Sequence, residues 1–278
     1  MQRSSLSGSF LLIQTLSSFW KHSSIDLITS DDPTGRLALV FELMDVNFYE
    51  AIKERKTYLP EAKVRGWIYQ LILAIDHMHS KGIFHRDIKP ENILLKDDTV
   101  KLADFGSCRG MSFKPPLTEY ISTRWYRAPE CLLTDGHYNQ QIDVWGIGCV
   151  FFEMLSLYPL FPGEKYELNQ VEKIFSTIGP PQQSLIDKWK KNSNHLKNMN
   201  FDLSAPRKTL ASKLPHVSRE CVEFIESCLV YDPDLRITAS QAKNHPYFRE
   251  LREGDARRFR QVSSIRPREK ERESSCEG

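Results

Sequence analysis

The sequence has no apolar run long enough to cross a bilayer, so we expect no membrane partner. Its six cysteines include no Cys-x-x-Cys pair and follow no regular spacing, which argues for reduced thiols in the cytoplasm or the nucleus. The net charge is only +2, and this excess is too small to indicate a nucleic acid partner. The 278 residues, 40% of them apolar, predict a globular chain with a large core, and we expect a monomer.

We also expect no secretory signal, although residues 7–20 resemble one at first sight. This segment is apolar around Phe10–Ile13, with a basic residue ahead of it. Gln14 and Thr15 interrupt the apolar run, and no small-residue cleavage site follows. We therefore expect no export of the chain.

What the sequence does contain is an ordered set of polar motifs in its middle. Residues 85–92 read His-Arg-Asp-Ile-Lys-Pro-Glu-Asn, and Asp104-Phe105-Gly106 follows a stretch rich in Val and Leu. Ala128-Pro129-Glu130 comes next in order. A single tripeptide of this kind is weak evidence, but the combination at these offsets is strong. The set resembles the signature motifs of protein kinases.

The resemblance implies phosphoryl transfer with ATP and Mg²⁺, a reaction that needs positioning and charge neutralisation. Asp87 would orient the substrate hydroxyl and accept its proton, and Lys89 would lie near the transferred phosphate. Asn92 and Asp104 would hold magnesium through oxygen atoms. The Lys89-Pro90 pair predicts a tight loop rather than a helix, so that Asp87 and Asn92 can face one cavity.

For His85 and Cys108, which lie near these residues in the sequence, we favour a structural role over a chemical one. The resemblance implies that His85 is a packed, hydrogen-bonded residue, and we leave it out of catalysis. Cys108 lies two residues after Gly106, where a reactive thiol at the nucleotide site is one interpretation. We favour a small buried side chain that fills space.

The apolar run of residues 36–44 predicts a buried strand that enters a connector. It resembles the kinase hinge, and the alternative is an ordinary core strand. The hinge is favoured because a helix of suitable length, opened by Pro60 and stopped by Gly82, separates it from the catalytic motif. The nucleotide-binding residues implied by the resemblance are Phe41 as gatekeeper, Glu42, Met44, Asn47 and Leu94.

Short strands are predicted at Ile93–Leu95 and Val100–Leu102, joined by a turn at Asp97-Asp98. This hairpin would place Asp104 at a strand end. Further along, the apolar run from Asp143 to Leu155 has almost no polar face, which is typical of a helix in the middle of a domain. The resemblance implies that Asp143 anchors the backbone of the catalytic loop.

The segment Thr118-Glu119-Tyr120 resembles the activation segment of mitogen-activated protein kinases, and the alternative is a solvated loop with this tripeptide by chance. Two phosphates on Thr118 and Tyr120, added by an upstream activating kinase, would need arginine partners. The candidates are Arg86 and Arg109 for Thr118, and Arg124 and Arg127 for Tyr120. The resemblance implies protein substrates with Ser or Thr followed by Pro.

Beyond this segment, Pro159–Gly163 resembles a stretch of cyclin-dependent and mitogen-activated kinases. Arg236 is expected to pair with Glu130 in a buried, structural ion pair. Residues 180–215 match an insert of this kinase group and receive no chemical role. From Arg249 onward, dense charges of both signs predict a solvated helix end that passes into disorder.

The residues ahead of the hinge depart from the family pattern. Before residue 41 the glycines are Gly8 and Gly35 and the one lysine is Lys21, so no Gly-rich loop or Val-Ala-Ile-Lys strand is present in that stretch. We therefore predict an α+β, protein-kinase-like fold of the CMGC group, MAPK-like, with a mostly helical carboxy-terminal lobe and only a remnant of the amino-terminal β-lobe. The expected parts are an atypical segment at 1–24, the remnant and hinge strand at 25–44, the lobe at 45–248 and a charged tail at 249–278.

Two functions follow from this sequence. The first is an ATP-dependent serine/threonine protein kinase. The second is a truncated, catalytically weak module that presents its activation segment and lobe surface to partners or upstream kinases. Without a cover over the triphosphate, transition-state stabilisation is expected to fall by orders of magnitude.

Overall fold

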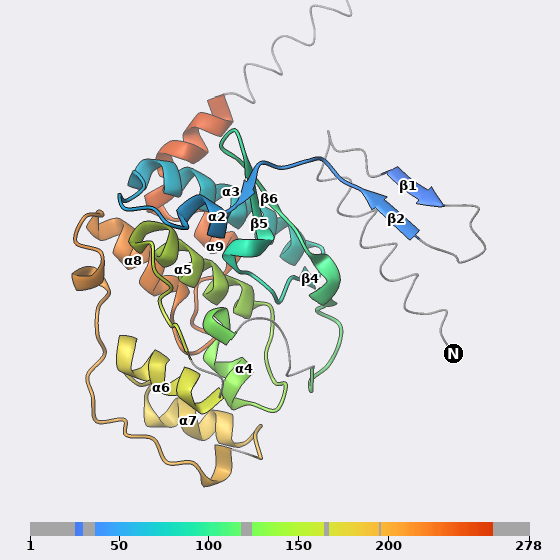
Figure 1. Cartoon of the computed structure of the whole chain (residues 1–278). Coiled ribbons are helices and arrows are strands. Elements are labelled where there is room, and N and C mark those ends of the chain that lie inside the picture. The colour runs from blue at the N-terminus through green and yellow to red at the C-terminus, as the bar shows by residue number, and fades with distance from the viewer. Residues whose placement is uncertain (1–25, 30–36, 118–123, 164–166, 195, 258–278) are drawn as a thin grey trace, which may run out of the picture. The chain divides into compact units, whose positions relative to one another are not determined.

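The computed structural model describes residues 26–29, 37–117, 124–163, 167–194 and 196–257 (Figure 1). They belong to two compact units that divide between Asp45 and Val46. Thr118 and Tyr120, as well as the expected disorder of the tail beyond residue 257, lie outside the described residues.

The smaller unit contains one antiparallel pair of strands, β1 (Asp26–Thr29) and β2 (Leu37–Val40). The prediction of a buried strand over residues 36–44 is wrong at its end. Strand β2 ends at Val40, and Phe41 and Leu43 are 62% and 84% exposed. A two-stranded ribbon has too few side chains to cover an apolar segment, so these residues stay in contact with solvent.

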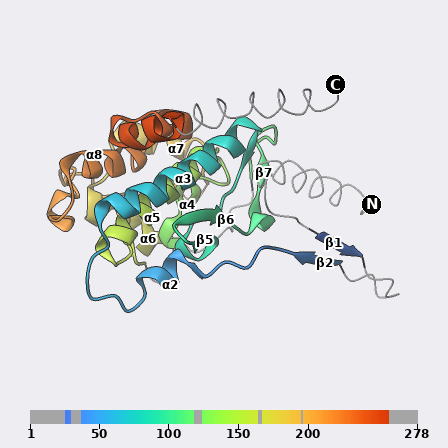
Figure 2. The ribbon, with the colours of Figure 1, turned by 90° about the horizontal axis from the view of Figure 1, so that it is seen from above.

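The larger unit is built around α5 (Gln141–Ser156), whose residues are all buried. This agrees with the prediction of a central apolar helix, because a helix without a polar face needs neighbours on every side. Helices α3 (Glu61–Ser80) and α8 (Arg219–Cys228) both pack against it. Figure 2 shows the same helices from above.

Helix α5 also brings the catalytic motif close to the core. A Cβ atom added to Gly146 would lie 2.8 Å from Cβ of Ile88, which is closer than two carbon atoms normally approach. Glycine at this position therefore allows the loop that carries Asp87 to lie directly on the helix.

Helix α3 begins after Pro60 and ends next to Gly82, as the sequence predicts. The predicted hairpin is formed by β5 (Ile93–Lys96) and β6 (Thr99–Leu102), and β3 (Val46–Asn47) pairs with the other edge of β5. Asp97 and Asp98 have φ of 47° and 64°, the left-handed pair that a two-residue hairpin turn requires. Trp67 of α3 donates its indole hydrogen to Asp98 at 3.0 Å.

The remaining elements complete the lobe. A two-stranded pair joins β4 (Ile83–Phe84) to β7 (Arg109–Gly110). The other helices are α2 (Phe48–Ile52), α4 (Pro129–Leu133), α6 (Glu167–Ile178), α7 (Gln183–Lys190), α9 (Ala239–Lys243) and residues 249–257. Single 3₁₀ turns occur at Pro90–Asn92, Phe105–Ser107, Arg124–Tyr126, Leu196–Asn198, Ala211–Lys213 and Pro246–Phe248. Within the described residues, no helix combines the length and apolarity needed to cross a membrane.

Candidate active site

Asp143, in the first turn of α5, anchors the backbone of the loop that carries the motif of residues 85–92, called the catalytic loop below. Its carboxylate accepts the backbone hydrogens of His85 and Arg86, both at 2.8 Å, and is 2.9 Å from Nε2 of His79. Burial alone raises the pKa of Asp143, but the hydrogen bond and charge of His79 and the contacts with His85 outweigh it, and the net shift is downward. An ionised carboxylate therefore fixes the loop where the resemblance expects it.

His85 is fully buried and links the loop to the end of β6. Its Nε2 atom lies 3.0 Å from the carbonyl oxygen of Ala103, which can only accept, so Nε2 carries the hydrogen. Nδ1 then accepts the backbone hydrogen of Asp87 at 3.3 Å. Burial lowers the pKa of His85 and keeps the ring neutral, as suits a packed residue.

The structure brings Asp87, Lys89 and Asn92 together. Oδ2 of Asp87 accepts hydrogen bonds from Lys89 Nζ at 2.9 Å and from Asn92 Nδ2 at 3.0 Å. Asn92 Nδ2 also donates to the backbone carbonyl of Asp87 at 2.9 Å. Asp87 and Asn92 are 5% and 7% exposed, so this arrangement is shielded from bulk water.

The prediction that Lys89-Pro90 forbids a helix needs a correction. Lys89 is extended, with φ of −154° and ψ of 160°, as a residue before proline should be. The chain nevertheless forms a 3₁₀ turn at Pro90–Asn92. Proline fits the first position of such a turn because its missing hydrogen would have no partner there.

Asp104 lies beside Asn92, because the backbone hydrogen of Ala103 is donated to the carbonyl of Asn92 at 2.8 Å. Asp104 has a left-handed φ of 59°, and its Oδ1 accepts from Gly106 N at 3.3 Å. Its side chain is exposed. The Asp104 carboxylate therefore lies just after β6, at the end of the β5–β6 hairpin that is opposite the Asp97-Asp98 turn.

These two residues fit a magnesium ion. The Asn92 amide is oriented with its nitrogen toward Asp87, so its oxygen is the atom that a cation could coordinate. Magnesium is usually held by one or two protein oxygens together with phosphate oxygens. Within the described residues, no group of three or more His, Cys, Asp or Glu could hold a metal ion.

In the larger unit, two of the residues predicted to contact the nucleotide lie on neighbouring strands. Asn47 and Leu94 are partners in the β3–β5 ladder, and Leu94 is half-buried. The Asn47 side chain accepts the backbone hydrogen of Glu50 at 2.8 Å and so caps α2. The sequence patterns did not predict this short helix. Phe41, Glu42 and Met44 belong to the smaller unit, with no regular secondary structure at these positions.

Arg86 and Arg109 are the predicted partners of a phosphate on Thr118, and Arg86 bonds to Tyr138. Arg86 donates from Nε to the carbonyl of Ser107 at 2.5 Å and from NH1 to the Tyr138 hydroxyl at 3.0 Å. Arg109 pairs with Phe84 in the β4–β7 ladder. Burial raises the pKa of Tyr138, and the charges of Arg86 and Arg109 oppose that shift. Arg124 is partly buried, and Arg127 is 6% exposed.

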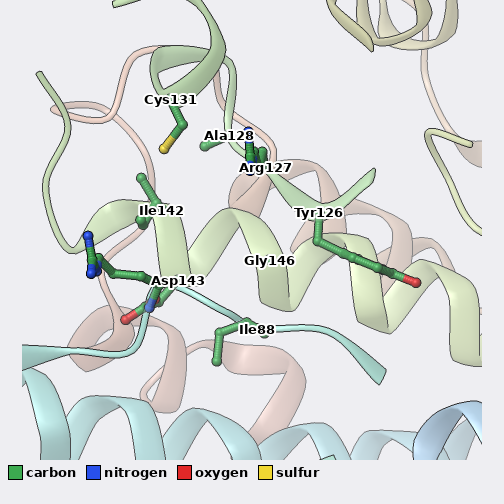
Figure 3. A pocket seen from close by; sticks show the side chains of 9 residues that line it. Ile88, Tyr126, Arg127, Ala128, Cys131, Ile142, Asp143 and Gly146 are labelled. Carbon is green, nitrogen blue, oxygen red and sulfur yellow. The ribbon is translucent and has the colours of Figure 1, made fainter. Parts of the chain in front are cut away.

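A cavity of about 20 Å³ lies between the catalytic loop, residues 126–128 and α5 (Figure 3). Ile88, Tyr126, Asp143 and Gly146 are among its lining residues. This volume accommodates about one water molecule and is far too small for a nucleotide. The cavity is therefore a packing feature beneath the loop.

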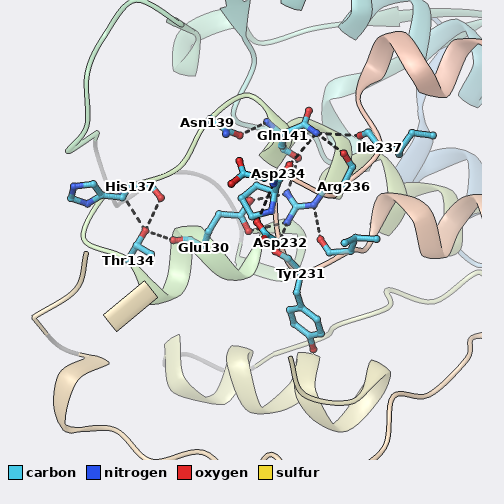
Figure 4. A network of polar contacts seen from close by, with 12 residues as sticks. Glu130, Thr134, His137, Asn139, Gln141, Tyr231, Asp232, Asp234, Arg236 and Ile237 are labelled. Atoms are coloured by element: carbon cyan, nitrogen blue, oxygen red, sulfur yellow. Dashed lines mark hydrogen bonds and ion pairs between the residues drawn. The ribbon is translucent and has the colours of Figure 1, made fainter. Parts of the chain in front are cut away.

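The predicted ion pair between Arg236 and Glu130 is present. The two guanidinium nitrogens lie 2.7 and 2.9 Å from the two carboxylate oxygens, with both side chains buried (Figure 4). Arg236 also donates to the carbonyls of Val230 and Gln141, both at 2.8 Å. The pair therefore joins α4 to α5 and to the loop before α9.

Sequence reasoning missed Glu153, the single acidic residue on the buried length of α5 beyond Asp143. Its Oε2 accepts the hydroxyl hydrogen of Tyr126 at 2.8 Å. Burial raises the pKa of Glu153 to about 7, with the charge of Glu91 adding to the shift. An isolated carboxylate in an apolar run was the available signal. His79 and Tyr138 were also missed as polar partners of this site.

Cys108 is buried, and burial raises the pKa of its thiol. A thiol that stays protonated is a weak nucleophile. The geometry favours the space-filling interpretation over the reactive one.

Comparison with known proteins identifies the family. The profile of the family described as "Protein kinase domain" matches residues 12–248. The chain belongs to the protein kinase domain family. Its fold is thus the predicted α+β kinase fold, with a mostly helical lobe and few strands.

Comparison with individual proteins shows which members of this family the chain resembles. A MAPK/MAK/MRK overlapping kinase from Homo sapiens is 50% identical over 234 residues, which cover 83% of this chain and 54% of that protein. The Mus musculus kinase of the same name is 50% identical over 225 residues, 80% of this chain and 52% of that protein. Serine/threonine-protein kinase MAK from Homo sapiens is 40% identical over 214 residues, 76% of this chain and 34% of that protein.

These relatives are CMGC-group kinases, and the chain is a member of the serine/threonine protein kinase family of the MAK type. It spans about half the length of the MAPK/MAK/MRK overlapping kinases that it matches.

Proposed function

We propose that the chain transfers phosphate from ATP to serine or threonine side chains of proteins. The observation that carries this proposal is the arrangement of Asp87, whose Oδ2 is 2.9 Å from Lys89 Nζ and 3.0 Å from Asn92 Nδ2. Asp143 holds the same loop in place through two backbone hydrogen bonds of 2.8 Å. A carboxylate fixed in this way is positioned before the substrate arrives, which is the main requirement of phosphoryl transfer.

Each residue has a distinct role in this proposal. Asp87 orients the substrate hydroxyl and takes its proton, while Lys89 adds positive charge beside the carboxylate. Asn92 and Asp104 are the residues that would hold the magnesium ion. Magnesium-bound ATP would supply the phosphoryl group and neutralise the charge that develops during transfer. Phe41, Glu42, Met44, Asn47 and Leu94 are proposed to contact the nucleotide.

We further propose that activity is regulated by phosphorylation of Thr118 and Tyr120 by an upstream kinase. Support comes from Arg86, which is fixed by hydrogen bonds to Ser107 and Tyr138, since a positioned guanidinium group favours a phosphate. Arg124 and Arg127 are proposed partners of Tyr120. The proposed substrates carry Pro after the phosphorylated Ser or Thr.

Phosphorylation of a Ser-Pro peptide with ATP tests the proposal directly. We expect transfer that depends on magnesium and falls at least 100-fold in both Asp87→Asn and Asp104→Ala. The matched control is Asp202→Asn, because the Asp202 carboxylate is exposed and, among the described residues, bonds to Ser204 in its own loop. Equal activity of Asp87→Asn and the wild-type chain would contradict the assignment of Asp87.

Nucleotide binding is tested separately by thermal unfolding. A ligand that binds only the folded state raises the midpoint by mass action. We expect a higher midpoint with millimolar ATP and magnesium, and a smaller rise in Asp104→Ala. No shift in the wild-type chain would exclude ATP binding under these conditions.

A second candidate function is a catalytically weak module that presents its lobe surface and activation segment to partners. The sequence ahead of the hinge favours it, since residues 1–40 contain one lysine, Lys21, and two separated glycines, Gly8 and Gly35. Phosphorylation of the chain by an upstream kinase, together with no peptide turnover and no nucleotide shift, would support this function over the first.

A further inference from the structure

Leu117, the residue directly ahead of Thr118, is bonded to the loop that follows α4. Its backbone nitrogen donates to the carbonyl oxygen of Gly136 at 2.8 Å. Gly136 has a left-handed φ of 75°, and a Cβ atom built on it would lie 2.2 Å from the carbonyl oxygen of Leu117. Glycine is therefore required here both by the backbone angle and by the close approach of the two chain segments. Gly136 thus fixes the backbone that leads into Thr118.

The loop of residues 134–137 is itself held by α4. The Thr134 nitrogen donates to the carbonyl of Glu130 at 3.1 Å, and the Thr134 hydroxyl lies 2.5 Å from the same oxygen (Figure 4). This hydroxyl also accepts the backbone hydrogen of His137 at 3.2 Å. Because the Glu130 side chain is paired with the buried Arg236, the loop begins at a firmly packed helix.

Asp135, the residue before Gly136, connects this loop to the chain that follows α7. Its carboxylate accepts the hydroxyl hydrogen of Ser193 at 3.0 Å and the backbone hydrogen of Asn194 at 2.9 Å. Its own backbone nitrogen donates to the carbonyl of Asn192 at 3.0 Å. One loop residue is thus bonded to three consecutive residues elsewhere in the lobe.

The serine on the far side of this contact is buried. Ser193 is 4% exposed, and its hydroxyl accepts the backbone hydrogen of Leu196 at 3.0 Å while donating to Asp135. A buried hydroxyl that both donates and accepts holds its neighbours in one arrangement. The stretch of residues 180–215, called the insert below, therefore has a packed point of attachment beside Gly136.

A second attachment lies on the other side of the proposed phosphorylation sites. Trp125 donates its indole hydrogen to the carbonyl of Gly163, and Tyr126 donates its hydroxyl hydrogen to Glu153, both at 2.8 Å. An enzyme has to draw several residues of a segment into its cleft, so a segment attached at both ends is accessible only when one attachment opens. Leu117 is half-buried whereas Tyr126 is buried, so the attachment at Leu117 is the one that opens more readily.

We propose that the insert restrains the backbone ahead of Thr118 through Asp135, and that it thereby limits the access of other enzymes to the Thr118–Tyr120 segment. This inference rests on the proposed regulation by phosphorylation of that segment. Asp135 and Ser193 are positioning residues in it, because they act on Leu117 through the backbone of the loop after α4. Removing either side chain releases this end of the segment.

Hydrogen exchange of the Leu117 backbone amide, followed by ¹⁵N–¹H NMR, tests the restraint without any need for activity. We expect exchange to be at least 10-fold faster in Asp135→Ala and in Ser193→Ala, because the loop loses its attachment to the insert. The matched controls are Asp202→Ala and Ser204→Ala. These two exposed residues of the insert also form a serine-to-aspartate hydrogen bond, at 2.6 Å, and both variants should leave the exchange unchanged.

The amide of Val100, which donates to the Gln70 side chain at 3.0 Å in the β5–β6 hairpin, is the internal reference. A merely structural role of Asp135 would speed up exchange at Val100 and Leu117 alike, and that result would overturn the proposal, as would unchanged exchange at Leu117. The double variant of Asp135→Ala and Ser193→Ala should exchange no faster than Asp135→Ala, since both changes break one connection. Multiplied effects would contradict this route.

Cleavage by thermolysin before Ile121 measures access to the segment in the native chain. We expect cleavage at least 10-fold faster in Ser193→Ala and an unchanged rate in Ser204→Ala. Gly136→Ala adds a steric test, because its Cβ would meet the carbonyl of Leu117. If Gly136→Ala does not fold, the Ser193→Ala result still decides. Equal cleavage of all variants, despite faster exchange at Leu117, would overturn the link between the insert and access.

The proposed function and this restraint can fail separately. If the wild-type chain phosphorylates no peptide, the kinase function fails, while exchange at Leu117 and thermolysin cleavage still decide whether the restraint exists. If the wild-type chain is active and neither measurement changes in Ser193→Ala, the restraint alone is excluded.

Discussion

The Asp143 carboxylate accepts the backbone hydrogen of Arg86 at 2.8 Å, although 57 positions separate the two residues. This bond, with its neighbour at His85, places the base of the catalytic loop on the first turn of α5. Because the start of a helix also favours negative charge, the position suits an ionised carboxylate.

Replacing this carboxylate is expected to loosen the loop. Asp143→Asn presents an amide with only one acceptor atom to two backbone donors and to His79. Hydrogen bonds to a buried charge are each worth about 1.5–3 kcal/mol, so we expect the free energy of unfolding to fall by about 3 kcal/mol. Urea unfolding measures this change, with the exposed Asp202→Asn as the control that should leave the midpoint in place. An Asp143→Asn midpoint equal to that of the wild-type chain would show that the loop does not depend on this charge.

Breaking the Glu130–Arg236 ion pair is expected to lower the free energy of unfolding by more than Asp143→Asn does. Glu130→Gln leaves a fully buried guanidinium group without its counter-charge, which typically costs about 3–5 kcal/mol. The matched control is Asp234→Asn, which breaks an exposed pair with Lys188 at 2.7 Å and should change stability by about 0–1 kcal/mol. Denaturant titrations of both variants give the comparison. Similar midpoints for the two variants would mean that burial does not increase the stability cost of removing the Glu130 charge.

Glu153 predicts a pH dependence of stability. Its pKa is raised from 4.5 to about 7 in the folded chain, so the folded state retains a proton that the unfolded state has lost between these values. The free energy of unfolding therefore decreases as the pH rises from about 4.5 to about 7, by about 3 kcal/mol for a shift of this size.

Glu153→Gln isolates this contribution from those of His85 and Asp143, because only the difference between the two proteins is used. Urea unfolding at pH 5, 6, 7 and 8 should show the variant gaining stability over the wild-type chain as the pH rises. A constant difference across this range would contradict the raised pKa of Glu153.

The thiol of Cys108 is expected to react slowly with alkylating reagents. Its thiol is buried and its pKa is raised, so the thiolate that reacts with iodoacetamide is scarce in the folded state. We expect alkylation at pH 7.5 to be at least 100-fold slower in the folded chain than in urea, measured by mass spectrometry of the peptide that contains Cys108. Rapid labelling under native conditions would instead favour the reactive-thiol interpretation.

The regular elements were well predicted because their signals are local. Pro60 and Gly82 bracket α3, and the apolar run from Asp143 predicts α5 to within two residues at its start. The Asp97-Asp98 turn predicts the β5–β6 hairpin, since both residues tolerate left-handed backbone angles. Each of these signals lies within or next to the element that it specifies.

The edges of the site were predicted less well. The apolar run at residues 36–44 has the composition of a buried strand, yet only Leu37–Val40 is a strand and Phe41 is 62% exposed. Burial depends on the layers that cover a segment, and the sequence of the segment does not contain that information. Asn47 is a similar case, because its cap on α2 depends on Glu50 and competes with its interpretation as a nucleotide contact.

The sequence by itself determined the family, the order of the motifs and the identity of the residues that carry charge, because these depend on spacing along the chain. Only the tertiary structure decided how those residues are held. The contacts of Asp143 with His79, of Tyr126 with Glu153, and of Trp125 with Gly163 beside Gln170 join parts of the chain that are distant in sequence. Such contacts form only when helices pack in one arrangement, and the polar groups that packing buries must find partners within it.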